Sequence, residues 1–119
     1  MWIFTPQGMF SIVQHRQNPD VLLVRARCRE DLQAFADSVL GAGNGTVKIK
    51  RTPQADYRWR CTVPRDVFIR WLYGQAMGIR YPNFKAAVHG EPDRDLAYTR
   101  CWHAMRDFQD NRVRAGGAG

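Results

Sequence analysis

The sequence predicts an α+β fold, a two-layer sandwich in which helices pack on one face of a mostly antiparallel sheet of about five strands. Three segments alternate apolar and basic residues with a period of two, which is typical of half-buried strands: 21–27, 46–51 and 57–63. Between and after them, apolar residues recur at helical spacing. The turns that join the strands are short, which favours antiparallel pairing.

Residues 1–16 are expected to form a hairpin. Strand residues Trp2 to Phe4 precede a Pro6-Gln7-Gly8 turn, and the chain returns along residues 9–13. Pro6 supplies the fixed φ of a turn, and Gly8 is expected to supply the positive φ that follows. Because this turn does not match the preferred two-residue hairpin loops, two separate edge segments remain an alternative. A second turn at 17–20 leads into the strand at Val21.

The next segment is predicted to be a helix that begins at Arg29 and ends at Gly41. Acidic residues in its first turn suit the helix dipole. Its apolar stripe consists of Leu32, Phe35, Ala36, Val39 and Leu40. Residues 41–45, Gly-Ala-Gly-Asn-Gly, are interpreted as a linker. They lack the lysine and the glycine spacing of phosphate-binding loops, and no helix follows them.

The strands at 46–51 and 57–63 are expected to pair as a hairpin through residues 52–56. Pro64 then opens a helix that ends near Gly78, because proline is tolerated in a first turn. A short helix is expected after Pro82, and Asp93 can cap a final helix. We expect one domain over residues 1–110 and a flexible Gly/Ala-rich tail over 111–119.

The period-two alternation predicts that the sheet has one basic face. Leu22, Val24, Ile49 and Trp59 would lie beneath the helices, and Tyr57 and Cys61 would share their side by parity. The candidate binding residues on the open face are Arg25, Arg27, Lys48, Lys50, Arg58 and Arg60. Like charges directly opposite one another destabilise a sheet, so this face indicates an anionic partner.

The charge pattern leaves more than one partner open. The net charge is +7, which favours contact with nucleic acid or with an acidic protein surface. A basic sheet can hold single-stranded nucleic acid by neutralising phosphates, with aromatic residues stacking on bases. The four tryptophans are expected to lie mostly in the core, however. The sequence therefore favours a small non-enzymatic binding protein that contacts nucleic acid. The alternatives are a protein-interaction module, such as a regulator or inhibitor that docks on a larger complex, and a merely solvated basic face.

The sequence shows no catalytic or metal-binding signature. His15, His89 and His103 lie far apart, without paired carboxylates at helical spacing, so they are interpreted as structural or surface residues. A small hydrolase or nuclease remains a third hypothesis. The cysteines are odd in number, form no C-x-x-C pair and fall on apolar sides of their elements: Cys28, Cys61 and Cys101. We expect buried, unpaired thiols, with no metal and no cofactor.

Two further features concern location and contacts. The N-terminus lacks a basic region and a cleavage site, and no apolar run reaches 18 residues, so we expect a cytoplasmic protein without a membrane partner. Residues 81–85, Tyr-Pro-Asn-Phe-Lys, form a dense polar and aromatic cluster. A helix entry with Phe84 packed inward is favoured over a contact loop.

Several motifs carry a resemblance to other proteins. The chain opens Met-Trp-Ile-Phe-Thr, continues through Gly8 to a Ser-Ile-Val-Gln stretch at 11–14, and carries V-R-A-R at 24–27 before an acidic helix start. The strand at 56–60 and the segment 79–85 also contribute to the resemblance. In these motifs the chain resembles a group of small, mostly uncharacterised bacterial proteins, although Met9 stands where that group has an aromatic residue. The resemblance covers residues 1–108 and implies a bacterial, cytoplasmic origin without implying a function.

Overall fold

The computed structural model describes residues 1–40 and 47–116 of the chain. Residue contacts divide the chain into two compact units, 1–79 and 80–119, where the sequence suggested one domain over 1–110. Each unit is described by itself. The linker expected at 41–45 lies outside the described residues.

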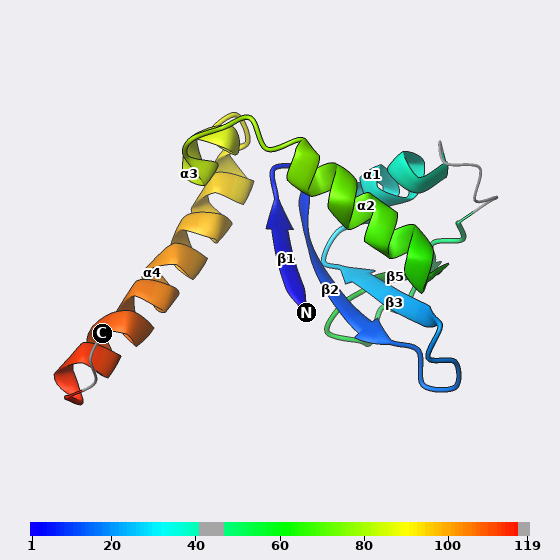
Figure 1. The fold of residues 1–119 in the computed structure, drawn as a ribbon, viewed down its shortest axis with the longest axis horizontal. Helices are drawn as coiled ribbons and strands as arrows, with labels where there is room; N and C mark the ends of the chain where they lie inside the picture. Colours follow the sequence, from blue (N-terminus) through cyan, green and yellow to red (C-terminus); the bar gives the residue numbers. More distant parts are fainter. Residues whose placement is uncertain (41–46, 117–119) are drawn as a thin grey trace. The chain divides into compact units, whose positions relative to one another are not determined.

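The first unit is built on a five-stranded sheet (Figure 1). In chain order the strands are β1 Trp2–Thr5, β2 Gly8–Gln14, β3 Val21–Ala26, β4 Lys50–Arg51 and β5 Trp59–Pro64. Their order across the sheet is β1-β2-β3-β5-β4, and every neighbouring pair is antiparallel. The central strand β3 therefore pairs along its whole length with β2 and β5.

Two helices, α1 Arg29–Leu40 and α2 Arg65–Met77, pack against the same face of this sheet. The predicted α+β fold is confirmed. Phe10, Phe35 and Trp71 meet at the centre of the interface, with ring centroids 5.1 to 5.8 Å apart. As the alternation predicted, Leu22, Val24 and Ala26 of β3 point into this core together with Phe10, Ile12, Leu32, Val39, Cys61, Val63, Val67 and Phe68. Tight burial of this apolar set is the main source of stability for the unit.

The first hairpin forms as predicted, but its glycine has a different role. Thr5 pairs with Gly8, and the Thr5 hydroxyl accepts hydrogen bonds from the N–H groups of Gln7 and Gly8. The φ of Gly8 is not positive, so the expected reason for the glycine is wrong. A Cβ at this position would lie 2.7 Å from Cγ of the buried Asp31 on α1. The carboxylate of Asp31 also accepts a hydrogen bond from the Met9 N–H at 3.3 Å, so Gly8 makes room for this contact.

The last strands are shorter than the alternation suggested. Of the described residues 47–51, only Lys50 and Arg51 join the ladder, and β5 begins at Trp59 rather than at residue 57. Val47, Ile49 and Trp59 are only half-buried, although they pack against the core from the expected side. An edge strand has a single neighbour, so a short ladder there leaves few unpaired backbone groups to solvent.

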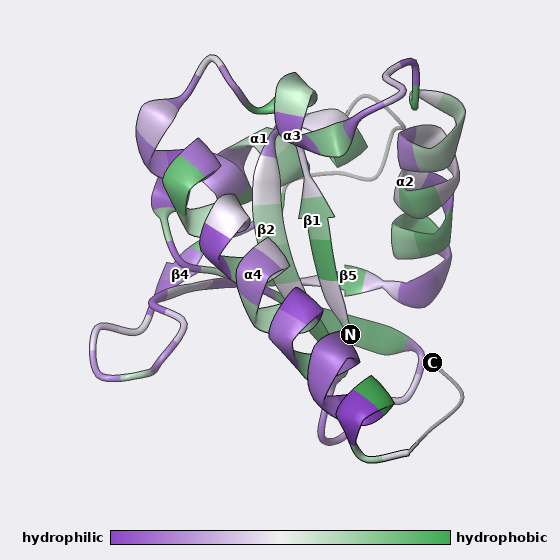
Figure 2. Cartoon of the chain, turned by 90° about the vertical axis from the view of Figure 1, so that its left-hand side faces the viewer, coloured by the Kyte–Doolittle hydropathy of each residue, from purple (hydrophilic) through white to green (hydrophobic). Residues whose placement is uncertain are grey.

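The second unit contains α3 Phe84–Ala87 and α4 Pro92–Arg114. The Asn83 side chain caps α3, and the Phe84 ring stacks on Tyr98 with 5.8 Å between centroids, consistent with the predicted helix entry. The ribbon of α4 is mostly hydrophilic, with separate hydrophobic residues along it (Figure 2). The helix continues to Arg114, beyond the start of the predicted tail at residue 111.

Several residues expected in the core are not buried. Trp71 is buried, but Trp2 is 69% exposed and Trp102 is 43% exposed. Cys61 is buried, whereas Cys28 is half-buried and Cys101 is exposed. Among the described residues, no helix has both the length and the apolar composition needed to cross a membrane.

Candidate functional site

The face of the sheet opposite the helices carries a row of cations. Arg25 on β3 lies directly opposite Arg60 on β5, and Arg60 lies directly opposite Lys50 on β4. On the other side Arg25 is opposite Ser11, which is itself opposite Trp2 on β1. Residues directly opposite in an antiparallel sheet point to the same face. Three positive side chains therefore stand side by side on three neighbouring strands.

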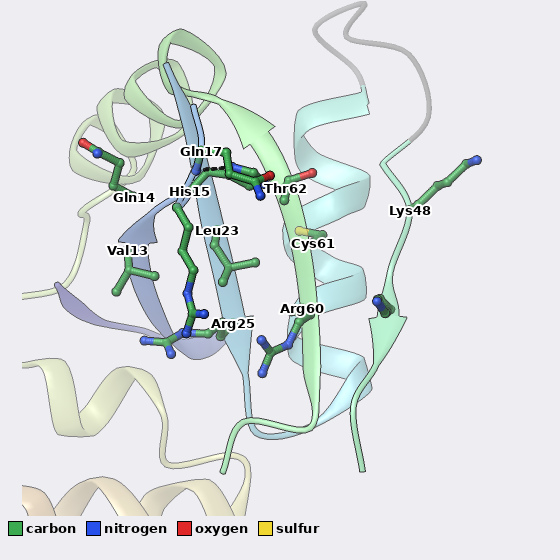
Figure 3. Close-up of a pocket in the computed structure, with 12 residues that line it drawn as sticks. Val13, Gln14, His15, Gln17, Leu23, Arg25, Lys48, Arg60, Cys61 and Thr62 are labelled. Carbon is green, nitrogen blue, oxygen red and sulfur yellow. Dashed lines mark hydrogen bonds between the residues drawn. The ribbon is translucent and has the colours of Figure 1, made fainter. Parts of the chain in front are cut away.

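These cations border a hollow of about 580 Å³ on the open face (Figure 3). Leu23, Arg25, Arg60 and Thr62 of the two central strands contribute to its lining, and Lys48 extends outward at one side. The rest of the lining comes from β2, from the turn that follows it, from β4 and from Cys61 of β5, whose side chain lies in the core: Val13, Gln14, His15, Arg16, Gln17, Lys50 and Cys61. The lining thus contains five cations and no carboxylate. A surface of this composition attracts anions.

The two central arginines are held in place by neutral groups. Nη2 of Arg25 donates a 2.7 Å hydrogen bond to the Ser11 hydroxyl, and Nη2 of Arg60 donates a 3.2 Å bond to the Tyr57 carbonyl. The Nε atoms of both arginines are buried and have no hydrogen-bond partner. Each guanidinium is thus oriented by the protein but is left with unused donor capacity.

Tyr57 lies with the arginines, which corrects the predicted parity. Its ring is buried, and the guanidinium carbons of Arg25 and Arg27 lie 4.8 and 4.1 Å from the ring centroid. The alternation fails here because residues 56–58 precede the strand. The Asp56 carboxylate accepts the Tyr57 N–H, and the Asp56 carbonyl accepts a bond from Arg27. Tyr57 therefore makes cation–π contacts with Arg25 and Arg27 on the open face instead of packing under the helices.

None of the six predicted basic residues forms an ion pair with a carboxylate anywhere in residues 1–40 and 47–116. Ion pairs occur elsewhere, for example between Arg70 and Asp66 at 3.5 Å and between Arg94 and Glu91 at 2.6 Å. The open face of the sheet therefore keeps its positive charge uncompensated within the described part of the chain.

The structure brings together four of the six predicted binding residues. Arg25, Lys48, Lys50 and Arg60 line the hollow. Arg27 and Arg58 are exposed but do not line it, because both lie just outside the ladders of β3 and β5.

Sequence reasoning missed Arg16 and Trp2. Arg16 precedes the turn at 17–20 and lies outside any alternating stretch. Trp2 stands in a run of four large apolar residues, 1–4, in which parity cannot be read from the sequence. The short connection between β2 and β3 was the available signal for Arg16, since it brings that residue back beside the central strands.

The hollow has few groups suited to bond-breaking chemistry. His15 accepts a 3.2 Å hydrogen bond at Nδ1 from the Gln17 N–H (Figure 3), and no acidic side chain lines the hollow. Burial raises the pKa of the Cys61 thiol to about 12, so this thiol is protonated and unreactive at neutral pH. Across the described residues, no three His, Cys, Asp or Glu side chains group closely enough to hold a metal ion. The arrangement is suited to binding an anion.

The chain matches no protein-family model, no curated protein and no solved structure.

Proposed function

We propose that this protein binds nucleic acid through the open face of its sheet, with phosphates held by the cations around the hollow. One observation carries the proposal: Arg25, Arg60 and Lys50 stand directly opposite one another on adjacent strands, with no carboxylate partner among the described residues. Adjacent strands are about 4.8 Å apart, so such a row concentrates charge.

The row is unfavourable for the protein alone. Like charges directly opposite destabilise a sheet, and each buried Nε without a partner adds a desolvation cost. A phosphate group has several acceptor oxygens and a negative charge, so it would offset both costs at once. A polyanion would do so along the whole row.

The shape of the site favours an extended ligand. The hollow is open and combines apolar side chains, Val13 and Leu23, with the cations Arg25 and Arg60 at one end of its lining. The apolar part suits sugars or bases, and the cations suit the backbone between them. Lys48 is exposed and extends outward beside β4, so it can contact a phosphate beyond the hollow on that side.

A salt titration with short DNA and RNA oligonucleotides tests the proposal. If the four predicted cations that line the hollow each contact a phosphate, log Kobs should fall against log[salt] with a slope of about −3 for a single strand. Lys50→Gln should make that slope shallower by about 0.7. The matched control is Arg70→Gln on α2, which removes the same charge from the helix side of the sheet and should leave the slope unchanged.

The outcomes separate the candidate partners. Absence of saturable binding at low salt would contradict the proposal, and equal effects of Lys50→Gln and Arg70→Gln would place binding elsewhere. Docking on an acidic protein surface, the alternative partner, would instead give weak binding to oligonucleotides and affinity for one protein that survives moderate salt.

A further inference from the structure

We infer that the open face prefers single-stranded nucleic acid and that Trp2 stacks on one of its bases. This inference rests on the proposed function and adds the ligand's form, its direction across the sheet and one contact residue. It starts from the placement of Trp2 at the end of the row that contains Ser11, Arg25, Arg60 and Lys50.

The position of Trp2 follows from the register. Ile3 packs against the core, so its neighbour Trp2 points to the other face of β1, toward the side of Ser11 and Arg25. The residue is 69% exposed, although it belongs to a strand that pairs with β2 over its full length. Tryptophan usually buries much of its surface, so an exposed indole at the end of a row of cations indicates a contact residue.

Trp2 and the cations lie in one row across the sheet. Ser11 lies between Trp2 and Arg25 and is 1% exposed, and its hydroxyl accepts the Arg25 hydrogen bond. The row from β1 to β4 crosses four strand spacings, or about 19 Å. A chain lying across the strands can therefore place phosphates on the β3, β5 and β4 cations and a base on the β1 indole.

Stacking on Trp2 requires an accessible base. In a duplex both faces of each base are covered by neighbouring base pairs, whereas in a single strand a base can turn onto an aromatic ring. Cations act on the backbone of either form. Trp2 is thus expected to add affinity for single strands alone, without strong sequence preference, because every base has a π-face.

The test compares Trp2→Ala with Tyr73→Ala. Tyr73 is a matched control, since it is an exposed aromatic residue, at 68%, on α2 at the opposite side of the sheet. Binding is measured for an oligothymidylate of about 12 nucleotides, a duplex and heparin. We expect Trp2→Ala to weaken oligothymidylate binding about tenfold and to leave duplex and heparin binding unchanged. Tyr73→Ala should change none of the three.

Two apolar variants test whether the contact is stacking. Trp2→Phe should keep most of the oligothymidylate affinity because phenylalanine can stack on a base. Trp2→Leu should lose that affinity because leucine is apolar but cannot stack. Thermal unfolding and circular dichroism confirm that each variant is folded. The part of the fluorescence change that oligothymidylate produces through Trp2 should disappear in Trp2→Phe.

Failure of this inference can be told apart from failure of the proposed function. Wild-type oligothymidylate affinity in Trp2→Ala would overturn the stacking contact, as would an equal loss for oligothymidylate, duplex and heparin. The effect of Lys50→Gln on the salt slope tests the proposed function independently. If the wild-type protein binds none of the three probes at low salt, both are refuted.

Discussion

Arg60→Met is expected to stabilise the first unit at low salt, although it removes a large charged side chain from the middle of a sheet. Arg60 lies directly opposite Arg25 on one side and Lys50 on the other, so the substitution removes two like-charge pairs at once. Methionine keeps an unbranched apolar stem of similar reach over the hollow. The backbone ladder of β5 is unaffected.

The magnitude can be worked from these contacts. Two unit charges about 6 Å apart in water repel by about 0.7 kcal/mol, so relief of both pairs contributes about 1.4 kcal/mol. Loss of the hydrogen bond from Arg60 to the Tyr57 carbonyl costs about 1 kcal/mol, and removal of the buried Nε without a partner returns about as much. The last two contributions nearly cancel, so the net gain is about 1.4 kcal/mol at low salt and falls toward zero at about 1 M salt, where the Debye length is about 3 Å.

Urea unfolding at low and high salt measures this effect. At low salt the urea midpoint of Arg60→Met should exceed that of the wild type, and thermal unfolding should show a rise in Tm of about 6–11 °C. Lys50→Met, which relieves one pair, should show roughly half the gain. Arg70→Met on α2 is the charge-matched control and should not gain. A loss of stability that is equal at both salt concentrations would show that Arg60 is held by its contacts more strongly than it is repelled, and the reasoning would be refuted.

Two further predictions concern the glycines and the buried thiol. Gly8→Ala should destabilise the protein by about 2 kcal/mol, because the added Cβ would meet Asp31. Gly74→Ala should stabilise α2 by about 0.5–1 kcal/mol, because a Cβ there meets nothing within 4 Å, and thermal unfolding compares the two variants. Because burial raises the pKa of Cys61 from its ordinary value of 9.0 to about 12, stability present below pH 9 should be lost as pH rises toward 12, by about 1.4 kcal/mol per unit. Urea midpoints against pH should flatten in Cys61→Ala, and iodoacetamide should label the exposed Cys101 before Cys61.

The central part of the fold could be predicted because its local pattern and its burial agree. In β3, Leu22, Val24 and Ala26 alternate with polar or half-buried neighbours, and this strand has partners on both sides, so the period-two pattern is maintained over its length. The two helices beneath it carry apolar stripes that match the inward face of the sheet. Where a segment has two strand neighbours and one helix layer, its sequence specifies its orientation.

The rest depended on contacts between residues far apart in the chain. The role of Gly8 follows from Asp31 on another element, which no local turn rule can show. Tyr57 lies before the start of β5, where hydrogen bonds from Arg27 and Arg60 to carbonyls of residues 56 and 57 replace the ladder, so parity no longer applies. Trp2 could be placed only through its register with Ser11.

The unfavourable features of the described structure gather at one place. The buried nitrogen atoms that lack a hydrogen-bond partner are both on the open face, in Arg25 and Arg60, and the same two residues form the like-charge pair across β3 and β5. Other charged groups in the described residues have ordinary partners, such as Asp66 with Arg70 at helical spacing and the Asp31 carboxylate with the Met9 N–H. Threonine, as at position 62 of the same strand, would suit an exposed strand position without the repulsion between like charges.

Local conflicts that persist in an otherwise consistent structure are expected at functional sites. If the cost of the arginine row is offset when an anionic chain occupies it, Arg60→Met should gain stability and lose nucleic-acid affinity together, whereas in a merely solvated face the two properties would be unrelated.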